Sequence, residues 1–260
     1  MHRFFVPRDA LSENAVRLPE DVSRQIARVL RLRPRDTIAL FDGSGYEWLA
    51  RIDKVTHRKV VATVTQRRSP ATEPTVRVTL TQALLKSDRF ELVLQKAVEL
   101  GVHAVQPLVC NRTVPAQPSQ SRTARWERIV REAAEQSGRV RVPAILGPTP
   151  LQSAADPNLG AAIVLWEGER SRSLRSVLRS LCGDEACRIN LIVGPEGGFE
   201  AWEVEALAAK SVAAAGMGPR TLRAETASIA ALAAVMYELG ELGPQRATGQ
   251  SWSPAQGPGA

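Results

Sequence analysis

The segment Ile192-Val193-Gly194-Pro195-Glu196-Gly197-Gly198-Phe199 gives the clearest indication of the fold. It follows an apolar stretch at 189–193, typical of a buried strand, and precedes a helical pattern at 200–210. Glycines allow backbone N–H groups to approach a ligand closely and permit positive φ angles. In open sheets of parallel strands, ligands bind at the carboxyl ends of the strands. The segment therefore predicts an α/β domain with a ligand site at this strand end.

A second glycine-containing segment lies about 20 residues further along the chain. Its sequence is Met217-Gly218-Pro219-Arg220-Thr221-Leu222-Arg223-Ala224-Glu225-Thr226, between a short predicted strand at 212–215 and a predicted helix at 225–239. Either segment alone is also compatible with a tight turn. Two such segments at the ends of neighbouring strands indicate a shared ligand site more strongly than either does alone.

Strands and helices alternate from residue 75 to residue 242. The predicted strands are 75–83, 102–109, 161–166, 189–193 and 212–215, and the predicted helices are 88–100, 123–137, 173–181, 200–210 and 225–239. Such alternation predicts a mostly parallel sheet covered by helices. The last helix is apolar nearly all round, which predicts burial in the core or against a partner chain.

The first 70 residues have a different pattern. Strands are predicted at 37–41, 47–52 and 59–64. A helix is predicted at 22–32, with Ile26, Val29 and Leu30 on one apolar stripe, and Pro34 would end it. These features predict a small β-barrel with one helix, followed by a linker at 67–74. Residues 1–70 hold 14 Lys+Arg against 8 Asp+Glu, a net charge of +6, whereas residues 71–260 hold 20 against 19, a net charge of +1. A basic module of this kind fits a polyanion-binding role, and a solvated Arg-rich surface fits equally well.

Several classes of site and location are disfavoured. The chain has no GxGxxG or GxxxxGK[ST] motif, and no lysine follows the glycines at 194–198, so nucleotide hydrolysis is not expected. Cys110, Cys182 and Cys187 match no metal-site spacing, and we expect a structural role for them in a reducing cytoplasm. No membrane span or secretory signal is expected, and residues 243–260 are rich in Gly, Pro, Gln and Ser, which predicts a disordered tail.

An ordered set of short segments extends along residues 1–242. These are Arg3–Val6, Val29–Arg33, Gln95–Val102, Glu135–Arg139 with Val142-Pro143, Val193–Phe199 and Gly218–Thr226. At these spacings the set resembles the RsmE-type 16S rRNA uracil-N3 methyltransferases of the SPOUT superfamily. Two departures are Asn111, where family members often carry an acidic residue, and Met217, where Leu is common.

The resemblance implies a fold that folding rules alone would argue against, because true knots are almost absent from proteins. It implies a trefoil-knotted parallel sheet with helices on both faces at 75–242, behind a PUA-like RNA-binding barrel at 1–70. It also implies a homodimer through the knotted domain, 16S rRNA of the small ribosomal subunit as substrate, and S-adenosylmethionine as cofactor. The implied cofactor-binding residues are Leu165, Trp166, Glu167, Val193, Gly194, Pro195, Glu196, Gly197, Gly198, Met217, Gly218, Leu222 and Thr226.

Uracil N3 must lose its proton before it can accept a methyl group. We hypothesise that Arg223 or Arg220 stabilises the developing anion through the uracil carbonyl oxygens. Glu225, or alternatively Glu196, would accept the proton or orient that arginine. A purely structural role for Glu225 is an acidic side chain in the first turn of a helix, which stabilises by about 0.3–1 kcal/mol.

Contacts with RNA are expected from basic side chains in both parts of the chain. The candidates are Arg3, Arg31, Arg33, Arg112, Arg139 and Arg220. Two other functions stay open: another SPOUT methyltransferase that acts on tRNA or on a ribose 2′-oxygen, and a non-catalytic RNA-binding ribosome assembly factor. Binding of the cofactor would separate the last of these from the enzymes.

Overall fold

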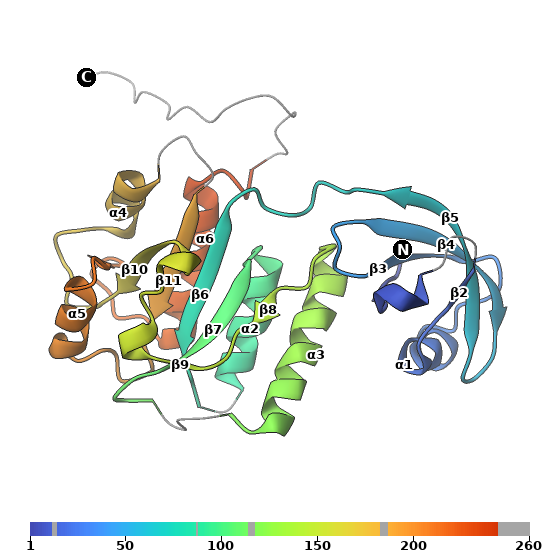
Figure 1. Ribbon diagram of the computed structural model, residues 1–260, viewed down its shortest axis with the longest axis horizontal. Coiled ribbons are helices and arrows are strands. Elements are labelled where there is room, and N and C mark those ends of the chain that lie inside the picture. The colour runs from blue at the N-terminus through green and yellow to red at the C-terminus, as the bar shows by residue number, and fades with distance from the viewer. Residues whose placement is uncertain (12–14, 87, 114–117, 183–186, 244–260) are drawn as a thin grey trace, which may run out of the picture. The chain divides into compact units, whose positions relative to one another are not determined.

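The computed structural model describes residues 1–11, 15–86, 88–113, 118–182 and 187–243 (Figure 1). The chain divides into an N-terminal unit, residues 1–73 with 131–142, and a C-terminal unit, residues 74–130 with 143–260. Helix α3 (Gln120–Ser137) contributes residues to both. The domain limits predicted from the sequence stay a prediction, and the predicted tail, beyond Gly243, lies outside the described residues.

The N-terminal unit contains a five-stranded sheet in the order β1-β3-β4-β5-β2. The strands are β1 (Arg3–Phe5), β2 (Val16–Arg17), β3 (Thr37–Phe41), β4 (Glu47–Val55) and β5 (Val60–Arg68). The three predicted strands are confirmed as β3, β4 and β5, which pair antiparallel, although β4 and β5 run beyond their predicted ends. The two shortest strands, β1 and β2, were not predicted.

The predicted helix at 22–32 is present in a different form. Helix α1 (Glu20–Arg24) continues as a π-helical turn (Gln25–Leu30), and Arg31 then adopts a left-handed φ of 52°. The helix therefore ends before Pro34. The predicted apolar stripe is wrong for Val29, which is 73% exposed while Ile26 is fully buried. The i→i+5 hydrogen bonding of a π-helix changes the angular spacing of side chains, so a stripe deduced from α-helical spacing does not hold.

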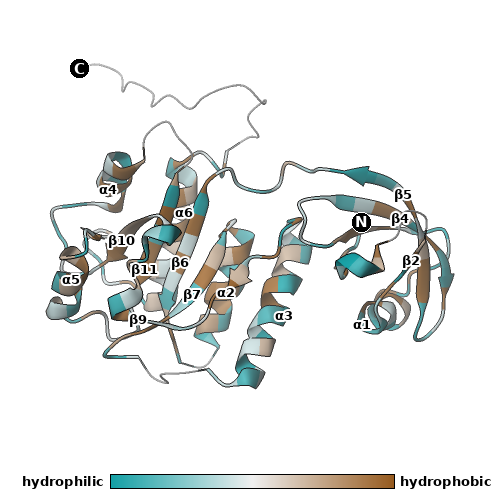
Figure 2. Ribbon diagram, viewed as in Figure 1, coloured by the Kyte–Doolittle hydropathy of each residue, from teal (hydrophilic) through white to brown (hydrophobic). Residues whose placement is uncertain are grey.

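The C-terminal unit contains a seven-stranded sheet whose strand pairs are all parallel, which confirms the predicted parallel sheet (Figure 1). The order is β12-β10-β11-β6-β7-β8, with β9 paired to β7. The strands are β6 (Arg77–Ala83), β7 (Ala104–Val109), β8 (Ala144–Ile145), β9 (Thr149–Pro150), β10 (Ala161–Leu165), β11 (Arg188–Val193) and β12 (Ala213–Ala215). Strands β10 and β11 consist mostly of hydrophobic residues (Figure 2).

Helices cover both faces of this sheet. Helices α2 (Arg89–Glu99), α4 (Leu174–Leu181) and α6 (Ala224–Glu238) form one layer, in which α6 contacts the other two and also packs on β6 and β11. Helix α5 (Ala201–Ala208) packs with a 3-10 turn (Leu151–Ser153) in a separate hydrophobic cluster. Residues 189–193 of β11 are all buried, and since successive strand residues face opposite sides, both faces of β11 are covered.

Helix α6 confirms the predicted helix and shows how its apolar surface is used. Ser228, Leu232, Val235 and Met236 are among its fully buried residues. Tyr237 on the other side is 73% exposed. Within one chain, therefore, the core covers one side of this helix.

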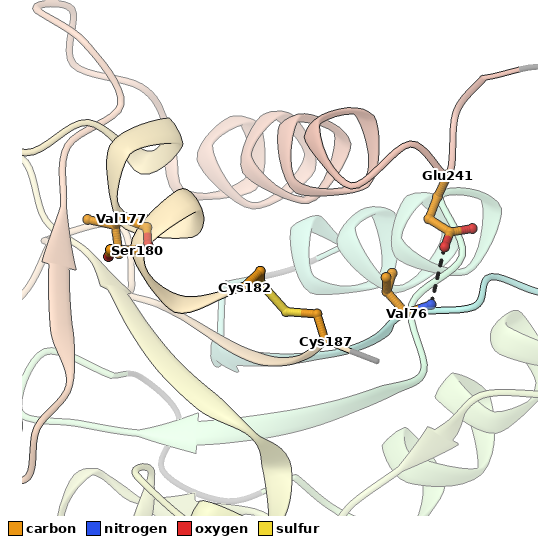
Figure 3. The surroundings of a disulfide bond; sticks show 6 residues. All are labelled: Val76, Val177, Ser180, Cys182, Cys187 and Glu241. Carbon is orange, nitrogen blue, oxygen red and sulfur yellow. Dashed lines mark hydrogen bonds between the residues drawn. A yellow bond between two sulfur atoms is a disulfide. The ribbon is translucent and has the colours of Figure 1, made fainter. Parts of the chain in front are cut away.

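A disulfide bond joins Cys182 and Cys187, with an S–S distance of 2.07 Å (Figure 3). It connects the end of α4 to the residue before β11. The sequence analysis expected structural cysteines in a reducing environment, and the disulfide differs from the second part of that expectation. Near the same end of the sheet, the Val76 N–H donates to the Glu241 carboxylate at 3.2 Å, which ties the segment after α6 to the segment before β6 (Figure 3).

Candidate functional site

A pocket of about 400 Å³ lies where the three adjacent strands β12, β10 and β11 end. The loops that follow these strands form its walls, at 165–170, 193–199 and 217–222, and Ala224 and Ala227 of α6 complete it. Because all three strands are parallel, their carboxyl ends lie at one edge of the sheet, the usual position of a ligand site in this architecture. A volume of several hundred Å³ suits a small organic molecule.

Twelve of the thirteen residues predicted to bind the cofactor line this pocket. The exception is Thr226, an exposed residue of α6 that is not part of the lining. Ala224 and Ala227, three residues apart, are the helix residues that face the pocket, so the intervening Thr226 points elsewhere.

Several lining residues were not predicted as part of the cofactor site. These are Arg170, Phe199, Pro219, Arg220, Thr221, Ala224 and Ala227. Six of the seven lie within or beside the two glycine segments, so a wider window around each segment would have found them. Arg170 lies instead three residues after Glu167, in the loop that follows β10. Arg220 had been predicted as an RNA contact instead.

The first loop is a tight turn built on glycine. The Gly198 N–H donates to the Pro195 carbonyl at 3.0 Å, and Gly198 has a φ of 68°. A Cβ atom at Gly198 would lie 2.3 Å from Glu167 Oε1 in the loop after β10. Glycine is therefore needed for the backbone conformation, whereas the flexible end of the Glu167 side chain could move away from a Cβ atom.

A buried amide connects the first loop to α6. Gln82 of β6 is fully buried, and its Nε2 donates to the Ala83 carbonyl at 2.9 Å and the Gly194 carbonyl at 3.3 Å. Its Oε1 accepts a hydrogen bond from the Ser228 hydroxyl. The opposite amide orientation would place Oε1 against two carbonyl oxygens, so only this assignment satisfies every group.

The position of the Ser228 hydroxyl hydrogen follows from the Gln82 orientation. Ser228 Oγ also lies 2.8 Å from the Ala224 carbonyl, which is another acceptor. A hydroxyl carries one hydrogen, and Gln82 Oε1 needs a donor, so we assign the hydrogen to Gln82. The first loop and the start of α6, which ends the second loop, are thereby held by one side chain.

The second loop begins at Gly216, which no sequence motif singled out. Its N–H donates to the Arg172 carbonyl at 2.9 Å, and its carbonyl accepts from the Leu174 N–H at 3.2 Å. A Cβ atom here would lie 2.2 Å from the Glu169 carbonyl oxygen. Because that atom belongs to the backbone, the segment before α4 can follow this path only with glycine at 216.

Of the two candidate proton acceptors, Glu196 lines the pocket, whereas Glu225, the residue after the lining Ala224, is not part of the lining. Glu196 Oε1 accepts from the Lys86 N–H at 2.9 Å and lies 3.5 Å from Arg89 Nη1. Glu225 Oε1 lies 3.8 Å from Arg89 Nε, and its Oε2 is buried without a hydrogen-bond partner among the described residues. Of the two candidate proton acceptors, Glu225 therefore retains an oxygen that no protein group in the described part of the chain occupies.

Comparison with known proteins agrees with this geometry. The domain family described as "RNA methyltransferase domain" matches residues 72–236, and the family described as "RNA methyltransferase PUA domain" matches residues 18–65. The chain belongs to the RNA methyltransferase family. Ribosomal RNA small subunit methyltransferase E from Synechocystis is 34% identical over 90% of this chain and 77% of the relative, and that from Bacillus subtilis is 30% identical over 82% and 86%.

A solved structure extends the likeness to three dimensions. A ribosomal RNA small subunit methyltransferase E from Neisseria gonorrhoeae, crystallised with S-adenosylmethionine, superposes with a TM-score of 0.82 at 33% identity. The match covers 91% of this chain and 97% of that one. The likeness confirms the fold class predicted above: a parallel sheet with helices, preceded by a PUA-like domain.

The candidate catalytic arginines of this RNA methyltransferase lie on the second loop. Arg220 lines the pocket and is exposed, whereas Arg223 is the residue before α6, also exposed, and is not part of the lining. Within the described residues, neither guanidinium has a carboxylate within the 4.0 Å of an ion pair. Both remain available for a bound acceptor.

Arg112, predicted to contact RNA, contacts the first loop and the start of α5 within the protein. Its guanidinium donates to the Gly197 carbonyl and lies 2.6 Å from Glu200. Glu203, which is fully buried, accepts from the Asn111 N–H at 2.9 Å. With Glu200 it forms a capping box at the start of α5. Burial raises the pKa of the neighbouring Cys110 thiol.

Two other predicted RNA contacts are engaged inside the N-terminal unit. Arg3 pairs with the fully buried Glu47 and donates to the Gly138 carbonyl at 2.8 Å. Arg139 is 5% exposed and lies 2.8 Å from Glu73. These guanidinium groups hold distant segments of the unit together, which occupies the donors that RNA would need. Arg31 and Arg33, by contrast, are exposed.

Two general properties of the described residues complete the picture. No helix among them is long and apolar enough to cross a membrane. No group of three or more His, Cys, Asp or Glu side chains among them is arranged to hold a metal ion.

Proposed function

We propose that this protein transfers a methyl group from S-adenosylmethionine to N3 of a uridine in 16S rRNA of the small ribosomal subunit. The observation that carries the proposal is the pocket at the ends of β12, β10 and β11, lined by backbone-rich glycine loops. The names of the relatives and the bound S-adenosylmethionine in the Neisseria protein support it. S-Adenosylmethionine supplies an electrophilic methyl group on a sulfonium.

The pocket fits such a cofactor in size and in the kind of groups that line it. Its volume, about 400 Å³, suits a molecule of this class, and two of its walls are glycine turns that expose backbone donors and acceptors. Gly218 has a φ of 95°, and a Cβ there would meet no atom within 4 Å, so this position opens onto free space. We assign cofactor binding to the twelve lining residues predicted above, and not to Thr226.

The acceptor base must lie in line with the methyl group, and its N3 must lose a proton. We assign Arg223 or Arg220 to the uracil carbonyl oxygens, where a guanidinium stabilises the developing negative charge. Glu225 takes the proton or orients the arginine, because its Oε2 has no partner among the described residues. Glu196 is the weaker candidate, since Arg89 and the Lys86 N–H already hold its carboxylate.

Binding of the rest of the substrate falls to exposed cations. We assign Arg31 and Arg33 to RNA phosphates, and Arg220 as well where Arg223 serves the uracil oxygens. We do not carry Arg3, Arg112 or Arg139 forward, because their guanidinium groups have partners within the protein. A cytoplasmic homodimer completes the proposal, with the trefoil knot in each C-terminal domain. The exposed side of α6, which includes Tyr237, is suited to the dimer contact.

The decisive test is methyl transfer from radiolabelled S-adenosylmethionine to small ribosomal subunits that lack their native methyl group. The expected product is 3-methyluridine in 16S rRNA, identified by mass spectrometry. Cofactor binding with label in tRNA or on a ribose 2′-oxygen would move the substrate to another RNA. Absence of cofactor binding would contradict the enzyme assignment and favour an RNA-binding assembly factor.

The arginine assignment has its own test. Arg223→Ala should lower kcat by about 10²–10³-fold, the effect of removing one preorganised donor from a developing charge, while the cofactor Kd stays unchanged. The same result with Arg220→Ala would assign the role to Arg220. Arg77→Ala, at the amino end of β6 and remote from the strand ends that form the pocket, is the matched control and should retain full turnover. Full turnover in both loop variants would contradict the proposal.

A further inference from the structure

The N-terminal unit carries a group of aromatic and cationic side chains that the proposed function does not use. Tyr46 lies just before β4, Trp48 is the second residue of β4, and Arg67 is near the end of β5. The Arg67 guanidinium carbon lies 3.7 Å from the Tyr46 ring centroid and 5.8 Å from that of Trp48. We call these three residues the Tyr46 cluster.

Strand geometry places the three side chains on one face. Trp48 and Arg67 are direct cross-strand partners, so they share a face of the sheet. Tyr46 precedes Trp48 by two residues, and alternate residues of an extended chain point to the same side. The two ring centroids are 6.4 Å apart. The backbone pairing of β4 and β5 therefore places these side chains on one face of the hairpin.

The turn before β4 brings a second cation to this position. Gly45 has a φ of 96°, and a Cβ there would lie 2.9 Å from Arg141 Nη2. The Arg141 guanidinium thus lies against the backbone of the residue next to Tyr46. A side chain at position 45 would displace it.

In the described part of the chain, the positive charges of Arg67 and Arg141 are not neutralised by an ion pair, in contrast to that of a neighbouring arginine. Arg68, the next residue, pairs with the buried Glu47. Within the described residues, Arg67 and Arg141 have no carboxylate within the 4.0 Å of an ion pair. Of these two cations, Arg67 lies against the ring of Tyr46, a residue that is 39% exposed, and Arg141 lies against the adjacent Gly45. Such uncompensated positive charge favours the binding of an anionic ligand.

We infer that the Tyr46 cluster binds an unpaired nucleotide of RNA. Single-stranded RNA is recognised by stacking of splayed bases on aromatic rings and arginine planes, with cations on the neighbouring phosphates. Here the base stacks on Tyr46 and Arg67, and Arg141 contacts a phosphate. The half-buried Trp48, packed against the hydrophobic core, holds the platform in place. The inference rests on the proposed function only in taking RNA as the substrate.

Binding of a short single-stranded oligoribonucleotide that contains 2-aminopurine tests the inference, because stacking quenches the emission of that base. Tyr46→Ala should weaken binding by about tenfold and abolish the quenching, since one aromatic stack is lost. Tyr46→Phe should behave as the wild type. Arg67→Gln, which removes the guanidinium plane from the stack, should weaken binding and reduce the quenching. A duplex of the same sequence should bind all four proteins alike.

The matched control is Arg51→Gln, which removes the same charge from the opposite face of β4. Cofactor affinity and the thermal transition of every variant report whether the chain is folded. If Tyr46→Ala and Arg67→Gln bind the oligoribonucleotide as Arg51→Gln does, the inference is wrong. Methylation of 16S rRNA by the wild type in that case would leave the proposed function standing, and its absence would remove both.

Discussion

The two units present their functional groups in different ways. In the C-terminal unit the candidate site consists largely of backbone at the ends of three parallel strands, with glycines at 194, 197, 198 and 218. In the N-terminal unit the candidate groups are guanidinium side chains on a sheet and a helix, some of them in ion pairs and some exposed.

This difference decides how far each site can be deduced from the chain. A glycine loop between a strand and a helix has few alternative explanations, because its position in the fold follows from its neighbours in the sequence. An arginine has many, because its partner can lie anywhere in the chain. Four predictions test the contrast, beginning with the largest expected effect.

The backbone character of the C-terminal site predicts that Gly216→Ala abolishes methyl transfer. The added Cβ would overlap the Glu169 carbonyl oxygen, so the segment before α4 and the second loop cannot both keep their places. Isothermal titration should detect no cofactor binding. Gly147→Ala is the control, because a Cβ at Gly147 meets no atom within 4 Å. Normal affinity in the Gly216 variant would mean that the loop adapts, and the pocket would then depend less on backbone geometry than we argue.

The N-terminal unit should respond to a pair of arginine variants in opposite ways. Arg3→Ala leaves the buried Glu47 with one partner fewer, and breaking a buried ion pair costs about 3 kcal/mol of unfolding free energy. Urea unfolding measures this loss, while RNA affinity under folding conditions stays unchanged. Arg31→Ala, at an exposed position, should leave stability within about 0.5 kcal/mol and weaken RNA binding instead. The reverse pattern would return Arg3 to the RNA contacts.

The buried amide predicts a smaller effect that connects stability to the pocket. Ser228→Ala removes the donor to Gln82 Oε1, and an unsatisfied buried acceptor costs about 1–3 kcal/mol. Because Gln82 also holds the Gly194 carbonyl, the cofactor Kd should rise along with the loss of stability. Ser180→Ala is the control, since that hydroxyl donates only within α4. Lost stability with an unchanged Kd would show that the first loop does not depend on this amide.

The same contrast explains which features could be predicted from the sequence. Strand 189–193 and helix 88–100 were placed within one residue at each end. The strand is an apolar stretch, the helix has an amphipathic pattern, and clear breaks bound both. Gln82 was missed, since an amide in a strand carries no signal of the two loops that it joins. The ion pair of Arg139, a predicted RNA contact, was not foreseen because its partner, Glu73, lies 66 residues away in a segment predicted to be a linker.

Features that need a change of local geometry were also missed. The π-helical turn at 25–30 places Val29 in solvent, and nothing in the spacing of the apolar residues distinguishes it from an α-helix. The trefoil knot and the homodimer came only from the family resemblance, and both stay predictions. They depend on the path of the whole chain and on a second copy, which local patterns do not encode.

The smallest expected effect concerns Glu135, a half-buried carboxyl in α3 that accepts from the Phe5 N–H at 2.8 Å. Burial raises the pKa of this group, and the Phe5 N–H and Arg131 oppose the shift only in part. A carboxyl whose pKa is higher in the folded chain binds more protons there than in the unfolded chain. Its contribution therefore favours folding below the unfolded pKa, about 4.3, and declines as the pH rises through the folded pKa.

Glu135→Gln keeps an acceptor for Phe5 and removes the titration, so urea midpoints across this range should decline less steeply with pH than in the wild type. Glu127→Gln, on the exposed side of the same helix, should retain the wild-type slope. Equal slopes in the wild type and Glu135→Gln would show that burial of this carboxylate does not lower the stability of the N-terminal unit. The side-chain contacts of that unit would then be less demanding in geometry than the backbone of the pocket.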